Sequence, residues 1–252
     1  MPPDSRLTTS KVPAVTLGFW LIKIAATTLG ETGGDALSMS LGLGYLVSTA
    51  IFAVVFAAAA GAQIGARRFR PLLYWLTIVA TTTVGTTLAD FADRSLGIGY
   101  AGGSTLLLAL LLASLATWYR VLGSIAVDSV ATPRAEAFYW ITIMFSQTLG
   151  TALGDWTADS AGMGYTGAMM IFGGLLLAVA AAYFWTRLSR TALFWLAFVL
   201  TRPLGAVVGD FLDKPIDHGG LALSRIGASA VLVALMLVFI LLFPQRPADK
   251  AH

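Results

Sequence analysis

Four copies of one sequence pattern divide this chain into repeats, and no other feature constrains its fold as strongly. In each copy an aspartate follows a small residue by one position, a glycine by five and a tryptophan by fifteen. The aspartates are Asp35, Asp90, Asp155 and Asp210, which are 55, 65 and 55 residues apart. Three copies continue into a Gly-x-Gly-Tyr motif, whereas the fourth has only Gly219-Gly220. A fixed period of this kind indicates one structural unit repeated four times, consistent with two duplications.

The composition is typical of a protein embedded in a membrane. Hydrophobic residues make up 57% and charged residues 12%, with a mean hydropathy of +0.80, whereas water-soluble domains average roughly 25% charged residues. The absence of cysteine excludes disulfides, thiolate metal sites and a cysteine nucleophile. The first apolar run, from Val12, contains a lysine and leads directly into the first repeat, so no cleavable signal peptide is expected.

Eight apolar spans follow one another along the chain, each about 20 residues long and therefore able to cross a hydrocarbon core of ~30 Å as a helix. They lie at about 13–34, 45–66, 72–92, 101–123, 136–157, 165–187, 192–213 and 221–243. We predict an all-α integral membrane protein of eight transmembrane helices, forming a single transmembrane domain over residues 1–252. Its four parallel two-helix repeats lie at about 13–66, 72–123, 136–187 and 192–243.

The distribution of basic residues predicts the orientation. Eleven of the 16 Lys and Arg residues fall on the side that holds both termini. Three, Arg94, Lys214 and Arg225, fall on the other side, and Lys23 and Arg202 lie within spans. Because basic residues concentrate in cytoplasmic loops, both termini are expected in the cytoplasm, in a bacterial inner membrane. This use of the basic residues leaves no reason to expect a nucleic-acid partner.

A polar stripe runs along each odd-numbered span. In the first span it consists of Lys23, Thr27, Glu31 and Asp35, at intervals of four residues. The corresponding residues of the other repeats are Ile78, Thr82, Thr86 and Asp90; Ile143, Gln147, Thr151 and Asp155; and Phe198, Arg202, Ala206 and Asp210. Ionisable groups at membrane depth turn toward the bundle interior. Four aspartates that merely end four helices would explain the Asp column, but not the deeper Glu31.

Small residues beside the stripe predict how the helices are arranged. They form small-x-x-x-small pairs, which let helix backbones approach closely. The pairs are Gly30 and Gly34, Gly85 and Ala89, Gly150 and Gly154, and Gly205 and Gly209. We therefore expect the odd helices to form an inner ring around one axis and the even helices an outer ring. One layer, about 12 Å below the aspartates by helical rise, should hold Thr27, Thr82, Gln147 and Arg202.

The converging acidic residues are the candidate cation ligands. Oxygen ligands suit hard cations such as Mn²⁺, Mg²⁺ or Ca²⁺, and a cation or shared protons would relieve the repulsion between carboxylates. The candidate metal ligands are Glu31, Asp35, Asp90, Asp155 and Asp210, and further candidate ligands are Thr27, Thr82 and Gln147.

Two basic residues and one histidine need separate interpretations. Lys23 and Arg202 are candidate coupling residues or counter-ions of the carboxylates, and purely structural salt bridges remain an equal alternative. No histidine lies in any span and His218 is a lone loop residue, so a Ser–His protease is excluded. No enzymatic activity and no resident cofactor are expected.

Two resemblances follow from these motifs. The fourfold Gly-x-x-x-Gly-Asp pattern and the all-membrane length resemble an uncharacterised bacterial family described as membrane-anchored proteins, over nearly the whole chain. The stretch from Glu31 to Asp35 is also similar to the Glu-x-Gly-Asp-Lys/Arg-Thr/Ser motif of calcium/manganese cation exchangers. It has one residue more between the acids, lacks the following basic residue, and has no Glu in the other repeats. This similarity implies metal-ion transport.

The function predicted from these residues is a secondary transporter of cations, in the specific form of proton-coupled efflux of a divalent, Mn-like ion. Its partners would be the lipid bilayer and a small cation, with the oligomeric state left open. One alternative is an organic-solute transporter or channel, with the Thr and Gln columns and the tryptophans lining the path. Another is a non-transporting membrane sensor or assembly module, against which the short loops argue.

Overall fold

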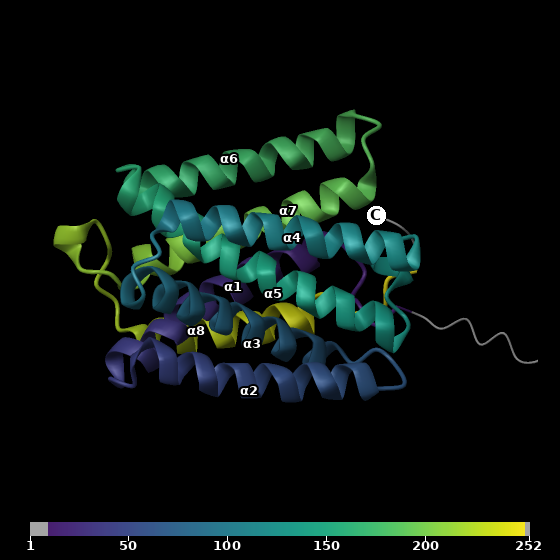
Figure 1. Cartoon of the computed structure of the whole chain (residues 1–252), viewed down its shortest axis with the longest axis horizontal. Helices are drawn as coiled ribbons and strands as arrows, with labels where there is room; N and C mark the ends of the chain where they lie inside the picture. Colours follow the sequence, from purple (N-terminus) through teal and green to yellow (C-terminus); the bar gives the residue numbers. More distant parts are fainter. Residues whose placement is uncertain (1–9, 250–252) are drawn as a thin grey trace, which may run out of the picture.

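The computed structural model describes residues 10–249, which form eight long helices joined by short connections (Figure 1). Each repeat contributes one pair of helices, so the predicted all-helical, four-repeat architecture is confirmed. The helices are α1 (Leu17–Asp35), α2 (Gly44–Gly65), α3 (Pro71–Asp90), α4 (Tyr100–Leu122), α5 (Pro133–Asp155), α6 (Gly164–Trp185), α7 (Arg190–Asp213) and α8 (Arg225–Leu242).

The connections differ between the first three repeats and the fourth. Helices α1, α3 and α5 each run into a π-helical turn, namely η1 (Ala36–Ser40), η2 (Phe91–Ser95) and η4 (Trp156–Ser160). The Gly-x-Gly motif then makes the turn into the next helix with both glycines at positive φ, for example 68° at Gly42 and 73° at Gly44. Side chains disfavour that conformation, which explains the glycines. Helix α7 instead ends at Asp213, and a loop over 214–224, containing the short helix η5 (Ile216–His218), leads to α8.

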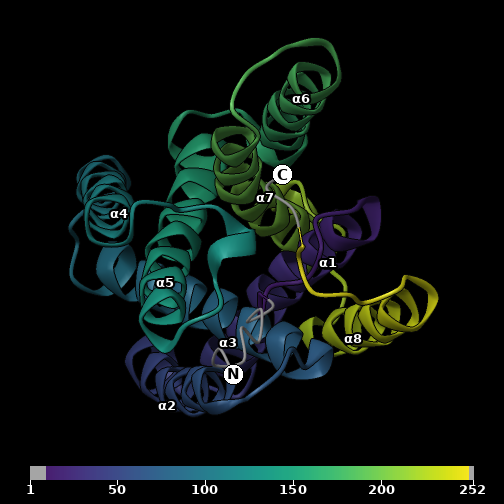
Figure 2. The ribbon, with the colours of Figure 1, turned by 90° about the vertical axis from the view of Figure 1, so that its right-hand side faces the viewer.

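The odd-numbered helices form a closed inner ring (Figure 2). Helix α1 packs against α3 and α7, and α5 packs against the same two helices. Each even-numbered helix packs outside this ring, mainly on the inner helix of the next repeat: α2 on α3, α4 on α5 and α6 on α7. The last helix, α8, packs on α1 and closes the circle. The structure thus agrees with the predicted division into inner and outer helices.

Glycines on the inner helices set how closely the ring packs. Each glycine five residues before a repeat aspartate lies against a side chain of the neighbouring inner helix, where a Cβ atom would collide with it. The pairs are Gly30 with Thr82, Gly85 with Gln147, Gly150 with Arg202, and Gly205 with Thr27. The predicted layer of Thr27, Thr82, Gln147 and Arg202 therefore exists as a packing layer, with each member seated between two helices.

Six of the eight helices are long and apolar enough to cross a membrane, and they make this chain a multi-pass membrane protein. The structure thus has six candidate membrane-spanning helices in residues 10–249, where the sequence predicts eight. Helices α1 and α5 are not among them, because residues such as Lys23, Glu31 and Gln147 lower their hydropathy. These side chains are buried inside the ring, so they do not face the surroundings of the molecule.

The end of the ring that carries the N-termini of the inner helices is filled with aromatic side chains. Trp75, Trp140 and Trp195 are buried there, and the hydroxyls of Tyr74 and Tyr139 are 2.6 Å apart. Trp20 is partly buried and packs against the same cluster, so the tryptophan column contributes to core packing.

The two ends of the described chain cover this aromatic layer together. Val12 is buried in the same cluster, and backbone hydrogen bonds join Ala14 to Arg246 and Ala248 to Val12. Lys11 donates to the last carbonyls of α2 and lies 2.6 Å from Glu136 on α5. This end of the axis is therefore closed.

Candidate cation site

The four repeat aspartates lie at the C-terminal ends of the inner helices, where the ring brings them together with Glu31. Each of these four residues is 1–3% exposed, and Glu31 is 2% exposed. Carboxylate oxygens within 4.8 Å of one another form three groups: Glu31, Asp155 and Asp210; Glu31, Asp35 and Asp90; and Asp35, Asp210 and Asp213. Glu31 belongs to two of these groups, so its carboxylate lies within 4.8 Å of a carboxylate oxygen of each repeat aspartate.

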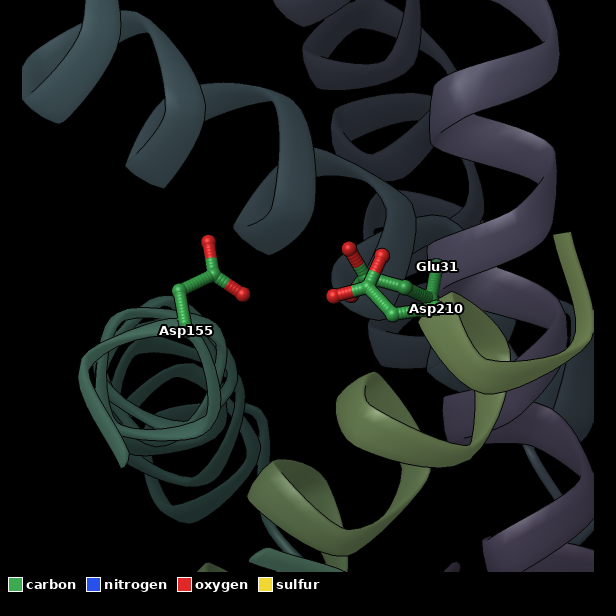
Figure 3. A group of neighbouring side chains, drawn as sticks. All are labelled: Glu31, Asp155 and Asp210. Carbon is green, nitrogen blue, oxygen red and sulfur yellow. The ribbon is translucent and has the colours of Figure 1, made fainter. Parts of the chain in front are cut away.

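Of the four repeat aspartates, Asp155 lies farthest from its nearest basic side chain. Figure 3 shows it pointing across the ring toward Asp210 and Glu31. Its Oδ1 is buried and has no hydrogen-bond partner among residues 10–249, and its Oδ2 is 3.7 Å from Arg94. A buried carboxylate oxygen without a partner is costly. The group of Glu31, Asp155 and Asp210 is therefore the best-placed seat for a cation.

Arg202 closes the site from below. Its guanidinium rises one turn along the ring, and its Nη2 donates to Glu31 Oε2 at 2.9 Å and to Thr86 Oγ1 at 2.6 Å. It also donates to the Thr151 hydroxyl. These acceptors belong to three different inner helices, so the guanidinium lies on the ring axis. The predicted counter-ion position of Arg202 is thus supported by a direct ion pair with Glu31.

Three further basic side chains reach the carboxylates from the end of the ring that lies away from the two ends of the described chain. Arg94 lies 2.8 Å from Asp90 Oδ1, and Lys214 Nζ lies 2.5 Å from Asp35 Oδ2 and 3.0 Å from Asp210 Oδ1. Burial lowers the pKa of Lys214, but Asp210, Asp35 and Asp213 raise it by more, so that its pKa lies above the ordinary value. Lys214 is therefore positively charged in this site.

Arg225 completes this set of contacts, since its Nε lies 3.3 Å from Asp213 and 3.7 Å from Asp35. The sequence predicts only that Arg94, Lys214 and Arg225 lie on the side opposite the termini, and these contacts were not predicted. A usable signal is present, because Arg94 and Lys214 stand four residues after Asp90 and Asp210, on the same helix face. The first and third repeats have Met39 and Asp159 at that position.

The charges of the site do not balance. Six buried carboxylates, those of Glu31, Asp213 and the four repeat aspartates, face four basic side chains, those of Arg202, Arg94, Lys214 and Arg225. The net formal charge of the site is −2 when all ten groups are ionised. Buried charge without compensation is strongly unfavourable. One divalent cation or two protons would neutralise it.

Lys23 lies apart from this cluster. It is fully buried, with Nζ 3.4 Å from Thr201 Oγ1 and 4.1 Å from the centre of the Phe198 ring. It forms no ion pair with a carboxylate in the described part of the chain. Of the two predicted counter-ions, the geometry therefore supports Arg202 and gives Lys23 no carboxylate partner.

The other candidate ligands also lie outside the carboxylate group. Thr27 donates to the backbone carbonyl of Thr201 at 3.2 Å, and Thr82 to that of Ala26 at 3.3 Å. Gln147 is fully buried and its amide has no partner within residues 10–249. The threonines that do face the axis are Thr86 and Thr151, one turn below the aspartates. The sequence analysis placed these two in the stripe without assigning them as ligands.

Comparison with known proteins gives a family and no function. No curated protein and no solved structure matches the chain, so the similarity to cation exchangers suggested by the Glu31–Asp35 stretch is not shown. A family model described as Repeat of Unknown Function (DUF347) matches four times, over residues 18–69, 73–123, 138–189 and 193–246. Because these matches cover most of the sequence and coincide with the four helix pairs, the chain belongs to this repeat family.

Proposed function

We propose that this protein is a secondary transporter of divalent cations, and that the ion binds among Glu31, Asp155 and Asp210. The observation that carries the proposal is the buried charge imbalance of −2 at the end of a closed helical ring. Carboxylate and hydroxyl oxygens favour a hard ion such as Mn²⁺ or Mg²⁺. Two protons on the same carboxylates would neutralise the same charge, so that an entering ion displaces protons. This exchange is the basis for proton-coupled movement.

The membrane arrangement that fits this proposal has eight spans. Helices α1 and α5 are 19 and 23 residues long, close to the 20 and 24 residues of α3 and α7, and their neighbours enclose them, so their polar side chains face the ring axis and not lipid. Both termini then lie on one side. The excess of Lys and Arg on that side favours a cytoplasmic location in a bacterial inner membrane. The carboxylates accordingly lie toward the outer side, and the aromatic layer lies toward the cytoplasm.

The eight-span arrangement can be tested with single cysteines, because the chain contains none. Asp128 lies in the connection between α4 and α5, and Asp217 in the loop between α7 and α8. In intact cells a membrane-impermeant maleimide should label the Asp217→Cys variant and should label Asp128→Cys only after lysis. Labelling of both variants in intact cells, or of Asp128→Cys alone, would contradict the proposed orientation.

The transport proposal predicts that Asp155→Asn stops movement of Mn²⁺ into proteoliposomes. The substitution removes one ligand charge while keeping the shape of the side chain, so the group loses much of its attraction for a divalent ion. Asp217→Asn is the matched control, since the Asp217 side chain is 80% exposed and should leave the flux unchanged. Equal fluxes through both folded variants would refute the assigned group. Absence of flux through the unsubstituted protein would favour an organic solute or a non-transporting function.

A further inference from the structure

The fourth repeat departs from the others at the outer end of the ring, and this departure places two basic residues over the site. The loop over 214–224 folds back on α7 through backbone hydrogen bonds from Leu221 to Phe211 at 2.7 Å and from Leu223 to Leu212 at 2.8 Å. Figure 1 shows this loop as the yellow-green segment that projects at the left. It begins with Lys214 and ends just before Arg225, so its fold delivers both side chains to Asp35.

These basic side chains occupy carboxylates that are themselves spaced as cation ligands. Asp35, Asp210 and Asp213 form one of the three oxygen groups. The Lys214 ammonium lies between the first two of them, and the Arg225 guanidinium lies beside the third. On the opposite edge of the ring, Arg94 lies between Asp90 and Asp155. On both sides of the ring, basic side chains of the protein therefore already occupy positions where a cation could bind these carboxylates.

These basic side chains are more exposed than the carboxylates that they contact. The side chains of Lys214, Arg225 and Arg94 are 12%, 22% and 34% exposed, whereas the carboxylate of Asp155 that Arg94 contacts is 2% exposed. Glu31 lies one turn deeper and is paired with Arg202 from below. An ion that comes from the outer end meets the three basic side chains first, and each of them repels it.

We propose that Lys214, Arg94 and Arg225 form a gate of tethered cations, which must leave their carboxylates before an ion from the outer side reaches Glu31. The identity of the passing ion rests on the proposed function, but the gate itself rests on the contacts alone. Lys214 is its principal member, because it makes two short contacts, at 2.5 and 3.0 Å, and Arg94 makes one short contact and a second at 3.7 Å.

The gate can be tested without any transport measurement. Thr86 lies beneath the carboxylates, within 3.2 Å of Glu31, and Thr86→Cys gives a single-cysteine reporter in a chain that has no other cysteine. The protein is reconstituted in liposomes, and the rate of modification by a small cationic methanethiosulfonate is measured. Adding Lys214→Gln should raise this rate at least about tenfold, since a hydrogen bond to a charged group stabilises by at least that factor. Arg94→Gln should raise it less.

Arg187→Gln is the control, because Arg187 is an exposed residue in the connection between α6 and α7, at the opposite end of the ring. It should leave the modification rate unchanged. If Thr86→Cys does not fold, Thr151→Cys reports from the same level on α5. The proposal is overturned if Lys214→Gln and Arg94→Gln both leave the rate at that of the parent reporter. Since modification requires no ion flux, a protein that fails to carry Mn²⁺ can still show the gate, and the two failures are distinguishable.

Discussion

Replacing Arg202 with methionine should lower the free energy of unfolding by about 3–5 kcal/mol, because the change leaves the buried Glu31 without its partner. Thr86 and Thr151 would lose the same donor. Lys23→Met is the matched control, since Lys23 is equally buried but has no carboxylate partner among the described residues. That substitution should leave stability unchanged or raise it. Thermal unfolding in detergent, followed by tryptophan fluorescence, measures both.

Two further measurements test whether the loss of stability comes from the unpaired charge of Glu31. Adding Glu31→Gln to Arg202→Met should restore part of the lost stability, because both partners of the ion pair are then absent. Mn²⁺ should stabilise Arg202→Met more than the unsubstituted protein, because the formal charge of the site changes from −2 to −3 and a ligand that binds the folded state stabilises it. Equal decreases in the free energy of unfolding for Arg202→Met and Lys23→Met would show that the ion pair with Glu31 makes no particular contribution to stability.

The second large effect concerns two glycines on α1, three residues apart. A Cβ at Gly30 would collide with the Thr82 side chain and lie 3.0 Å from its backbone carbonyl carbon, whereas a Cβ at Gly33 meets nothing within 4 Å. Gly30→Ala should therefore destabilise the protein by about 1–3 kcal/mol through overpacking. Gly33→Ala should stabilise it by up to about 1 kcal/mol, since alanine favours helix. The same unfolding measurement compares them, and similar shifts in one direction would contradict the close packing of α1 on α3.

The repeat pattern predicted the ring because it combined two independent constraints. Polar columns must turn away from lipid, and glycine pairs must meet another helix, so helices that carry both belong inside. The hydropathy of single spans was a weaker guide. Helices α1 and α5 fall short of the hydropathy of an ordinary span because they carry polar residues. The ring shields these residues, and this shielding is a tertiary effect that no window of sequence contains.

The site was predicted less well, for a reason of helix geometry. A step of four residues advances about 400°, roughly 40° beyond a full turn. The stripe from Lys23 to Asp35 therefore winds around α1, and only Glu31 and Asp35 face the carboxylate group. Thr27 turns into the contact with α7 and Lys23 lies over Phe198. The four-residue spacing, taken alone, predicted all four residues on one face of the helix.

The gate residues were missed for another reason. Counting basic residues assigns each one to a side of the membrane, but it does not give the direction of a long side chain. Lys214 and Arg225 reach Asp35 only because the 214–224 loop folds back on α7. That fold depends on backbone hydrogen bonds and on Ala222 at φ 52°, a conformation that residues other than glycine rarely adopt.

The closure of the circle by α8 on α1 has a consequence for biosynthesis. Helix α1 leaves the ribosome well before two of the helices that it packs against, α7 and α8. Until they arrive, Glu31 lacks Arg202, and Asp35 lacks Lys214 and Arg225. Burying these acidic side chains of α1 before their basic partners are in place would be unfavourable. A nascent chain that stops before α7 has no completed site, so the cluster forms only after α7 and the start of α8 have been made.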